Sequence, residues 1–557
     1  MAIPLFNDEA VYLSRAQHFP DQFLSTIHDG KLIHELLLAV LAHLPLDPLV
    51  SGRLLSVACG WLTVIGLWLS GKIVADQRAG ILAGLLYICS PLAIVHDLLA
   101  IPDAMLTSVA SFVLALSLRL NQMSNPHRWH AAGVGALVAL ASLVKLSGVF
   151  LFALPALTMI MRTMPPEQRH RRWEMVRTAL IVTLLALAAF APFNYGGAER
   201  RKVGALDLML QVERLGQNLY QIGEWITIAM PLSVLIIAGI GLATSQTRRQ
   251  HLFLFLSASL FCLALAVIGS VLYPRYILPV WIPILFAAGL SLSQHRQRRK
   301  ALRGISAALT LVTCLWGAFF TFQHIRNPAY APLTHSDRRQ YVEKWTAGYH
   351  MDEIVHQLRA EAERSGNIFL VSPLQLRLIH LGPGIYLHDD PRIAFIDIDM
   401  HATDARQQLG DLAAQRPLYM ALDAEEIVAF DMEIENLIRY TEPAVGLKPS
   451  ARQGKARLRG LYRIIYSKTI SLRLWNAKPA CAGYGGLCTQ RPSDASLLVS
   501  SVFKTEGERL PIRALHLPPR SRVLSTNCVR TQTGISACLT YTSMTTGKTI
   551  GRRRVCP

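Results

Sequence analysis

The stretch that decides the fold is AAGVGALVALASLVKLSGVFLFALPALTMIM, which spans residues 131–161. A single helix of this length would measure about 46 Å at about 1.5 Å per residue, whereas the apolar core of a bilayer is about 30 Å thick. Only one charged residue, Lys145, interrupts the stretch, near its middle. Either one over-long tilted helix crosses the membrane, or two short helices meet near Lys145.

The charges that flank this stretch distinguish the two alternatives. Arg119 and Arg128 precede it. A group of arginines follows it: Arg162, Arg169, Arg171, Arg172 and Arg177. Because short loops rich in Lys and Arg stay in the cytoplasm, both ends of the stretch are predicted to lie there. The chain therefore crosses out and back, and Lys145 is expected on the extracytoplasmic side.

The composition extends this interpretation to most of the chain. Its 557 residues are 52% hydrophobic and 17% charged, with a mean hydropathy of +0.31, which excludes an ordinary soluble protein. The net charge of +19 does not indicate nucleic-acid binding, because the basic residues lie in short loops between apolar runs. Further helix-length segments are predicted at 53–73, 79–96, 104–120, 176–192, 225–243, 251–272, 276–292 and 304–322.

Together these segments predict a mainly α fold, a polytopic transmembrane helix bundle of about ten spans within residues 1–322. Residues 323–466 are expected to form a small extracytoplasmic α/β domain, and residues 467–557 a disordered tail. In the α/β domain the pattern predicts a helix at 351–364 and strands at 368–371, 384–388, 392–398, 417–422 and 458–466. An acidic segment follows Met1 at once, and we expect about one helix to be missing before it.

Two groups of acids lie on the predicted external face. Asp8 and Glu9 are adjacent, and a carboxylate within reach of a hydroxyl can remove its proton during attack. Asp103, after Pro102, opens an apolar helix on the same face. The structural alternative is that all three acids are first-turn residues that complement a helix dipole. Asp397, Asp399 and His401 suggest a metal site less well than they suggest loop residues after a strand.

Two cations complete the candidate site. Lys145 lies among apolar residues, where a charge is costly unless it reaches water or a partner. Arg275 lies between two aromatics in Tyr273-Pro274-Arg275-Tyr276. Arg grips two phosphate oxygens and Lys acts as a compact charge, so the two are predicted to cradle a lipid phosphate. Snorkelling of the lysine and interfacial anchoring by the tyrosines are the alternatives.

These motifs in this order resemble one known group of enzymes. They are Asp8-Glu9 with Tyr12, Gly30-Lys31, Arg53 with Ser56, Pro102-Asp103, Val144-Lys145 and Tyr273-Pro274-Arg275-Tyr276. The set resembles the GT-C membrane glycosyltransferases, and within them the branch of bacterial protein mannosyltransferases, aminoarabinose transferases of lipid A and galacturonic acid transferases. The resemblance covers residues 5–325 and extends to 337–342 and 345–349. Leu32-Ile33 departs from it, because relatives often have prolines there.

The resemblance implies an inverting transfer of a sugar from a polyprenyl-phosphate donor. Asp8 would deprotonate the acceptor, and Glu9 and Asp103 would complete the catalytic acids, more as positioning groups than as proton carriers. The phosphate would bind near Lys145 and Arg275, with Lys31, Arg53, Tyr273 and Tyr276 in the wider substrate-binding set. A monophosphate donor does not demand a metal, no His or Cys cluster has ligand spacing, and a carboxylate magnesium site has no support. No cofactor is therefore predicted.

The partners implied are membrane lipids and an extracytoplasmic acceptor, which is a protein, lipid A or another glycan. The location implied is a bacterial-type inner membrane. Two other functions compete with this one. A transporter would show internal repeats and broken helices around a midplane site, whereas these polar residues gather on one face. A lipid-binding protein without enzymatic activity would have no need of Asp8. The sugar, the acceptor and the oligomeric state stay open at this point.

Overall fold

The computed structural model describes most of the chain as far as residue 422 and short segments beyond it. The described ranges are 5–19, 30–123, 126–161, 169–194, 205–244, 248–269, 272–294, 300–343, 347–348, 351–373, 377–422, 437–439, 460–464 and short strands between 529 and 555. The chain divides into two compact units, Met1–Ile470 and Ser471–Pro557. Most of the tail predicted to be disordered, 467–557, lies outside the described residues.

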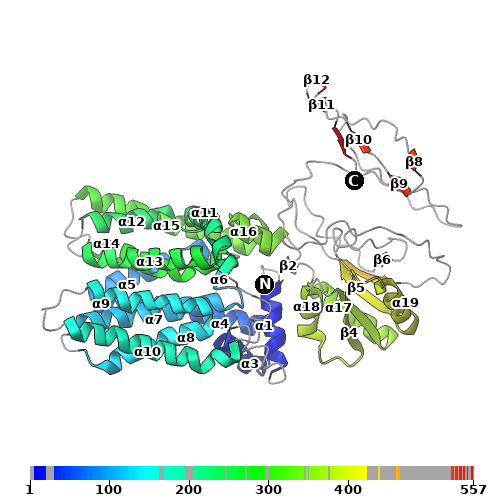
Figure 1. The fold of residues 1–557 in the computed structure, drawn as a ribbon, viewed down its shortest axis with the longest axis horizontal. Helices are drawn as coiled ribbons and strands as arrows, with labels where there is room; N and C mark the ends of the chain where they lie inside the picture. Colours follow the sequence, from blue (N-terminus) through cyan, green and yellow to red (C-terminus); the bar gives the residue numbers. More distant parts are fainter. Residues whose placement is uncertain are drawn as a thin grey trace. The chain divides into compact units, whose positions relative to one another are not determined.

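Helices dominate the first unit (Figure 1). The bundle is built from α4 (Pro48–Val74), α5 (Gln77–Ile88), α6 (Pro91–His96), α7 (Pro102–Gln122), α8 (Arg128–Val144), η1 (Leu146–Phe152), α9 (Ala153–Met161), α10 (Arg169–Asn194), α11 (Ala205–Ile228), α12 (Leu232–Thr244), α13 (Arg248–Ile268), η4 (Pro274–Ile277), α14 (Leu278–Ser293) and α15 (Lys300–Arg326). Every predicted span falls on one or two of these elements. Within the described part, five helices are long and apolar enough to cross a membrane, or six if the bent pair α11 and α12 counts as one span.

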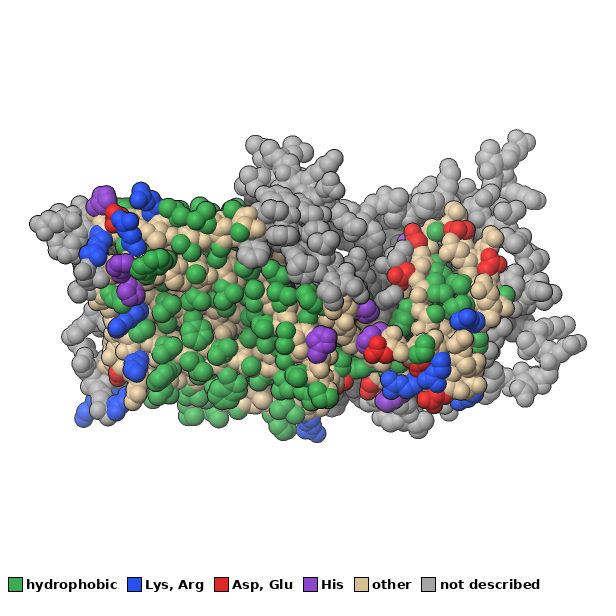
Figure 2. Space-filling view, turned by 90° about the horizontal axis from the view of Figure 1, so that it is seen from below, with side chains coloured by type: hydrophobic (Ala, Val, Ile, Leu, Met, Phe, Trp, Pro, Cys, Tyr) green, Lys and Arg blue, Asp and Glu red, His purple; other side chains and the backbone are tan. Residues whose placement is uncertain are grey.

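Local sequence explains where these helices begin. The α4 helix starts after Asp47, whose side chain accepts a hydrogen bond of 2.9 Å from the backbone N–H of Val50, and Pro48 occupies its first position. The outward faces are apolar: Leu311, Leu315 and Phe322 on α15 are 59%, 61% and 57% exposed. Figure 2 shows hydrophobic side chains over the flank of the bundle and Lys and Arg gathered at one of its ends. This surface suits lipid, and the chain is an integral membrane protein.

The chain reverses direction at Lys145, as the two-helix alternative predicts. Lys145 is extended, with φ −161° and ψ 133°, between the end of α8 and the start of η1. The N–H of Gly148 donates a hydrogen bond of 2.7 Å to the carbonyl of Lys145, and η1 folds back against α8. A Cβ on Gly148 would lie 2.3 Å from the carbonyl carbon and oxygen of Ala141. The turn therefore needs a glycine at this position.

Replacing Gly148 with Ala is expected to destabilise the protein by about 1–3 kcal/mol, because the added methyl group forces η1 away from α8. Thermal unfolding of the purified protein in detergent measures the change. Gly133→Ala is the matched control, since nothing lies within 4 Å of a Cβ at this position of α8. Equal melting temperatures for the two variants would show that the reversal tolerates a side chain.

The N-terminal segment is held by residues that follow the bundle in the sequence. Strand β1 (Leu5–Phe6) pairs antiparallel with β2 (Ala347–Gly348) and leads into α1 (Asn7–Gln17). The α1 helix packs on α3 (Leu32–Ala42) and on α18 (Arg377–Leu387), where the side-chain amide of Gln17 donates to the carbonyl of Ile385 at 2.8 Å. The first acids of the chain are therefore held by elements distant in the sequence.

The α/β domain contains one five-stranded sheet of order β4-β3-β5-β7-β6. Strands β3 (Ile368–Pro373), β4 (Ile393–Ile398) and β5 (Leu418–Leu422) are parallel, and β7 (Gly460–Ile464) and β6 (Leu437–Arg439) are antiparallel additions. Helices α17 (Met351–Ser365), α18 and α19 (Ala405–Gln415) complete it. The predicted helix and four of the predicted strands agree with these elements.

The strand predicted at 384–388 is wrong, because these residues belong to α18 and the turn after it. A short apolar run cannot by itself be assigned to helix or strand. In the structure Leu378 and Ile385, seven residues apart, are 0% and 1% exposed and join the core around α1. Contact with α1 thus selects the helical period. No group of three metal-binding side chains occurs in the described ranges, and Asp397, Asp399 and His401 form none.

Candidate functional site

Asp8 and Glu9 occupy the first turn of α1 and have different surroundings. The side chain of Asp8 is 30% exposed, whereas that of Glu9 is fully buried. Adjacent residues in a helix point about 100° apart, so one of the pair faces the interior and the other faces the open side. Asp8 is therefore the acid of this pair that a substrate can reach.

The contacts of Glu9 cap α1 and tie it to α4 and to the loop at Ala100. Its carboxylate accepts hydrogen bonds of 2.9 and 2.8 Å from the guanidinium of Arg53 on α4. It also accepts from the backbone N–H groups of Ala100, at 2.7 Å, and of Phe6, at 3.0 Å. With four donors around it, this carboxylate fixes the position of the helix that carries Asp8. Arg53, predicted in the substrate-binding set, is held in the same pair.

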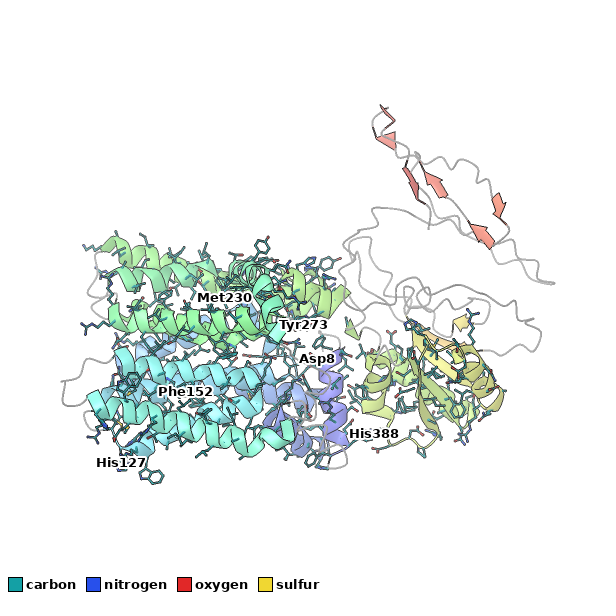
Figure 3. All side chains as sticks on the ribbon, viewed as in Figure 1. Asp8, His127, Phe152, Met230, Tyr273 and His388 are labelled. Atoms are coloured by element: carbon teal, nitrogen blue, oxygen red, sulfur yellow. The ribbon has the colours of Figure 1, made fainter. Side chains whose placement is uncertain are left out.

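Two acids, Asp8 and Asp103, meet two cations, Lys145 and Arg275, at one end of the bundle. The guanidinium of Arg275, on η4, donates to Asp8 at 2.8 Å and lies 3.8 Å from the carboxylate of Asp103 on α7. The Nζ of Lys145 lies 2.5 Å from the other oxygen of Asp103. Four segments separated by up to 267 positions thus bring their charges together. Figure 3 shows Asp8 close to Tyr273, at the opposite end of the bundle from His127.

Aromatic rings cover the two cations. Lys145 Nζ lies 3.8 Å from the ring centroid of Tyr276, and the guanidinium carbon of Arg275 lies 4.7 Å from that of Tyr273. The ring of Phe6 is 5.4 Å from the same guanidinium. A cation over an aromatic face is stabilised by the ring quadrupole without being neutralised. Tyr273 and Tyr276, which the sequence analysis placed in the substrate-binding set, therefore contact the two cations without neutralising them.

A second segment, which sequence reasoning assigned no role, also holds Arg275. It consists of α16 (His335–Arg338) and η7 (Arg339–Glu343). Arg275 Nη1 donates to the side-chain oxygen of Gln340 at 3.2 Å and to the hydroxyl of Tyr341 at 3.3 Å. Burial raises the pKa of Tyr341 well above its ordinary value, so this hydroxyl stays protonated. The only sequence signal for these residues is the resemblance at 337–342.

Lys31 lies at the edge of this site, beside α1. Gly30 before it has a φ of 69°, a left-handed value that favours glycine. The Nζ of Lys31 lies 4.6 Å from the ring centroid of Tyr12 on α1. Burial, followed by the charge of Asp8, raises the pKa of Tyr12 well above its ordinary value. The ring of Tyr12 therefore contacts Lys31 at the edge of the site.

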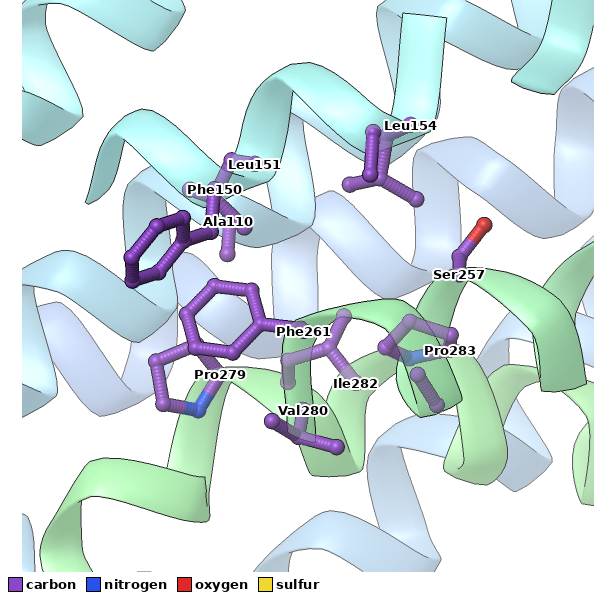
Figure 4. A pocket seen from close by; sticks show the side chains of 12 residues that line it. Ala110, Phe150, Leu151, Leu154, Ser257, Phe261, Pro279, Val280, Ile282 and Pro283 are labelled. Carbon is purple, nitrogen blue, oxygen red and sulfur yellow. The ribbon is translucent and has the colours of Figure 1, made fainter. Parts of the chain in front are cut away.

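Residues that follow Lys145 and Arg275 closely in the sequence line an apolar pocket. The side chains that line it are shown in Figure 4. Phe150 and Leu151 reach it from η1, which follows Lys145, and Pro279 and Val280 reach it from α14, which follows Arg275. Phe261 of α13 closes one side. The two segments that carry Lys145 and Arg275 thus also provide part of the wall of the apolar pocket.

The comparisons with known proteins agree with this architecture. Residues 31–195 match the family model described as dolichyl-phosphate-mannose-protein mannosyltransferase. The structure of ArnT from Cupriavidus metallidurans bound to undecaprenyl phosphate is similar with a TM-score of 0.50 and 15% identity, over 83% of this chain and 94% of that chain. Apo ArnT from the same organism gives 0.50 and 17%, over the same shares of the two chains. None of the curated protein sequences matches this chain.

A further solved structure is similar at a lower level. It is the oligosaccharyltransferase of Archaeoglobus fulgidus in complex with zinc and sulfate, with a TM-score of 0.41 and 14% identity over 76% of this chain and 64% of that chain. The helix bundle defines an integral membrane protein, and the acids and cations beside Asp8 form a polar site at one of its ends. The family match over residues 31–195 and the fold shared with ArnT show that this chain is similar to the GT-C membrane glycosyltransferases.

Proposed function

We propose that this glycosyltransferase moves a sugar from a polyprenyl-phosphate donor to an acceptor outside the cytoplasm. The observation that carries the proposal is the ion pair of Asp8 with Arg275, a partly exposed carboxylate beside a buried cation. One reaction needs both groups at one point: a base for the incoming acceptor and a positive charge for the departing phosphate.

In this reaction the acceptor hydroxyl attacks the anomeric carbon of the sugar while Asp8 takes its proton. The new bond joins the acceptor oxygen to the anomeric carbon, and the bond from that carbon to the phosphate oxygen breaks. The electron pair leaves with polyprenyl phosphate, which gains one negative charge. A single displacement of this kind inverts the configuration at the anomeric carbon.

Arg275 and Lys145 stabilise the charge that develops on the leaving phosphate. Arg275 is 5% exposed and Lys145 lies against a ring, so both act where water screens them little. The acids Asp8 and Asp103 balance these cations in the structure, and Asp103 keeps Lys145 in position. Glu9 positions α1 through Arg53, and Lys31 adds positive charge at the edge of the site.

The apolar pocket supports an isoprenoid donor. Its walls are continuous in sequence with the two cation-bearing segments, so a phosphate at Arg275 and Lys145 can extend its first isoprene units toward Phe150, Phe261 and Pro279. The similar ArnT structure contains undecaprenyl phosphate, a lipid of this class. Membrane lipids are the surrounding partners.

The charge distribution supports an extracytoplasmic site in a bacterial-type inner membrane. The basic end of the bundle, near His127 and Arg128, lies opposite the end that carries Asp8 (Figures 2 and 3). Basic ends of membrane helices stay in the cytoplasm, so the site faces the other side. The acceptor, a protein, lipid A or another glycan, is therefore a molecule of the cell envelope.

Purified protein given radiolabelled polyprenyl-phosphate sugars and a cell-envelope extract is expected to release polyprenyl phosphate as label enters the acceptor fraction. Mass spectrometry of envelope glycans and lipids, with and without the gene, identifies the acceptor. Folded protein that turns over none of the donors, and a gene deletion that changes no glycan or lipid, would together contradict the proposal.

A further inference from the structure

A buried acid and a buried histidine face one another on the far side of Arg275. His96 ends α6 and is 0% exposed, and Asp337 of α16 is 3% exposed. The Nε2 of His96 lies 3.8 Å from an oxygen of Asp337. Neither ring nitrogen of His96 has a hydrogen-bond partner among the described residues, nor does the second oxygen of Asp337. Burying polar atoms without partners is costly, so a stability role alone explains the pair poorly.

The pair connects two parts of the site. Asp337 and Tyr341 are four residues apart in the segment formed by α16 and η7, and both lie against His96, whose ring is 6.0 Å from that of Tyr341. Tyr341 in turn stacks edge-on with Phe6 at 4.8 Å and accepts a hydrogen bond from Arg275. The backbone N–H of Asp337 donates a hydrogen bond of 3.0 Å to the hydroxyl of Thr334, the residue before α16. His96 thus lies beside two residues of this segment.

We propose that His96 and Asp337 are positioning residues that seat Gln340 and Tyr341 against Arg275 and thereby set the affinity for the donor phosphate. The inference rests on the proposed function and adds two residues to that site. Contact between the neutral acid and the imidazole keeps the turn in place. When the acid loses its proton, a negative charge lies behind the guanidinium and opposes the phosphate.

The charged and titratable groups that face the pair fix the sign of this effect. They are Arg275 of η4, Lys145 after α8, His324 of α15 and Tyr341 of η7. Burial raises the pKa of Asp337 to about 7. Asp337 is therefore neutral below about pH 7 and charged above it.

The test measures kcat and KM for a polyprenyl-phosphate sugar between pH 6 and pH 8.5 in the wild type and three variants. In the wild type, the donor KM is expected to rise about tenfold across this range, the change that about 1.4 kcal/mol of repulsion produces, with a smaller change in kcat. Asp337→Asn, which keeps the shape and stays neutral, is expected to hold a low KM at every pH. His96→Ala is expected to raise KM at every pH.

The control is Glu361→Gln, a like change at a buried acid of the α/β domain that accepts from Tyr419 at 2.8 Å. It is expected to follow the wild-type pH profile. A donor KM that is independent of pH in the wild type, or an Asp337→Asn profile that keeps the wild-type slope, would overturn the inference. If His96→Ala fails to fold, the wild-type and Asp337→Asn profiles decide alone. Absence of any transfer by the wild type would instead count against the proposed function.

Discussion

Replacing Asp8 with Asn is expected to lower kcat by a factor of about 10² to 10⁴, the usual contribution of a general base. The amide has nearly the same shape as the carboxylate but cannot accept the proton of the attacking hydroxyl. Because Asp8 is the exposed member of the acid pair and Glu9 is enclosed by four donors, Glu9 cannot replace it. Transfer of label from a polyprenyl-phosphate sugar, measured at saturating donor, gives kcat directly.

The matched control for this variant is Asp47→Asn. Asp47 is an exposed acid in the loop before α4, where its side chain caps the helix by accepting from Val50. Asn caps a helix about as well as Asp, so stability and activity are expected to stay at the wild-type level. If Asp8→Asn kept the activity of Asp47→Asn in folded protein, the assignment of the base would be wrong.

Replacing Glu9 with Ala is expected to destabilise the protein by about 3–5 kcal/mol, because the buried Arg53 loses the carboxylate that compensates its charge. Arg53 is 4% exposed and loses both of its bonds to Glu9. Thermal unfolding in detergent measures the single variants Glu9→Ala and Arg53→Met and the double variant. The double variant is expected to lose less stability than the two single variants together, because both charges of the pair are removed at once.

A surface ion pair supplies the control for this cycle. Arg128 donates to Glu174 at 3.0 Å, with side chains 64% and 23% exposed. Exposed pairs contribute about 0–1 kcal/mol, so Glu174→Ala is expected to change the melting temperature little. A loss in Glu9→Ala no larger than that in Glu174→Ala would show that the buried pair does not hold α1.

The bundle could be predicted from sequence because its signal is local. Apolar runs bounded by Arg-rich loops mark the spans, and the excess length of residues 131–161 together with the flanking charges predicts the reversal at Lys145. The error at 384–388 has the opposite origin. The helical period of that run is selected by packing of Leu378 and Ile385 beside α1, which lies more than 350 residues away in sequence.

The site was predictable as a set of residues but not as a set of pairs. Asp8, Asp103, Lys145 and Arg275 stand out because acids and cations are rare beside apolar helices. Which acid is enclosed and which is exposed depends on Arg53, 44 residues from Glu9, and on the loop at Ala100. The contacts of Arg275 with Gln340 and Tyr341 span 65 and 66 residues. No spacing rule reports such tertiary contacts.

The most direct measurement follows the bridging oxygen of the donor. A polyprenyl-phosphate sugar carrying ¹⁸O between the anomeric carbon and phosphorus is turned over by the wild-type protein, and mass spectrometry locates the label while NMR gives the configuration of the product. The account predicts that the label leaves with polyprenyl phosphate and that the anomeric configuration is inverted. Label found in the glycosylated acceptor, or a product with retained configuration, would contradict it.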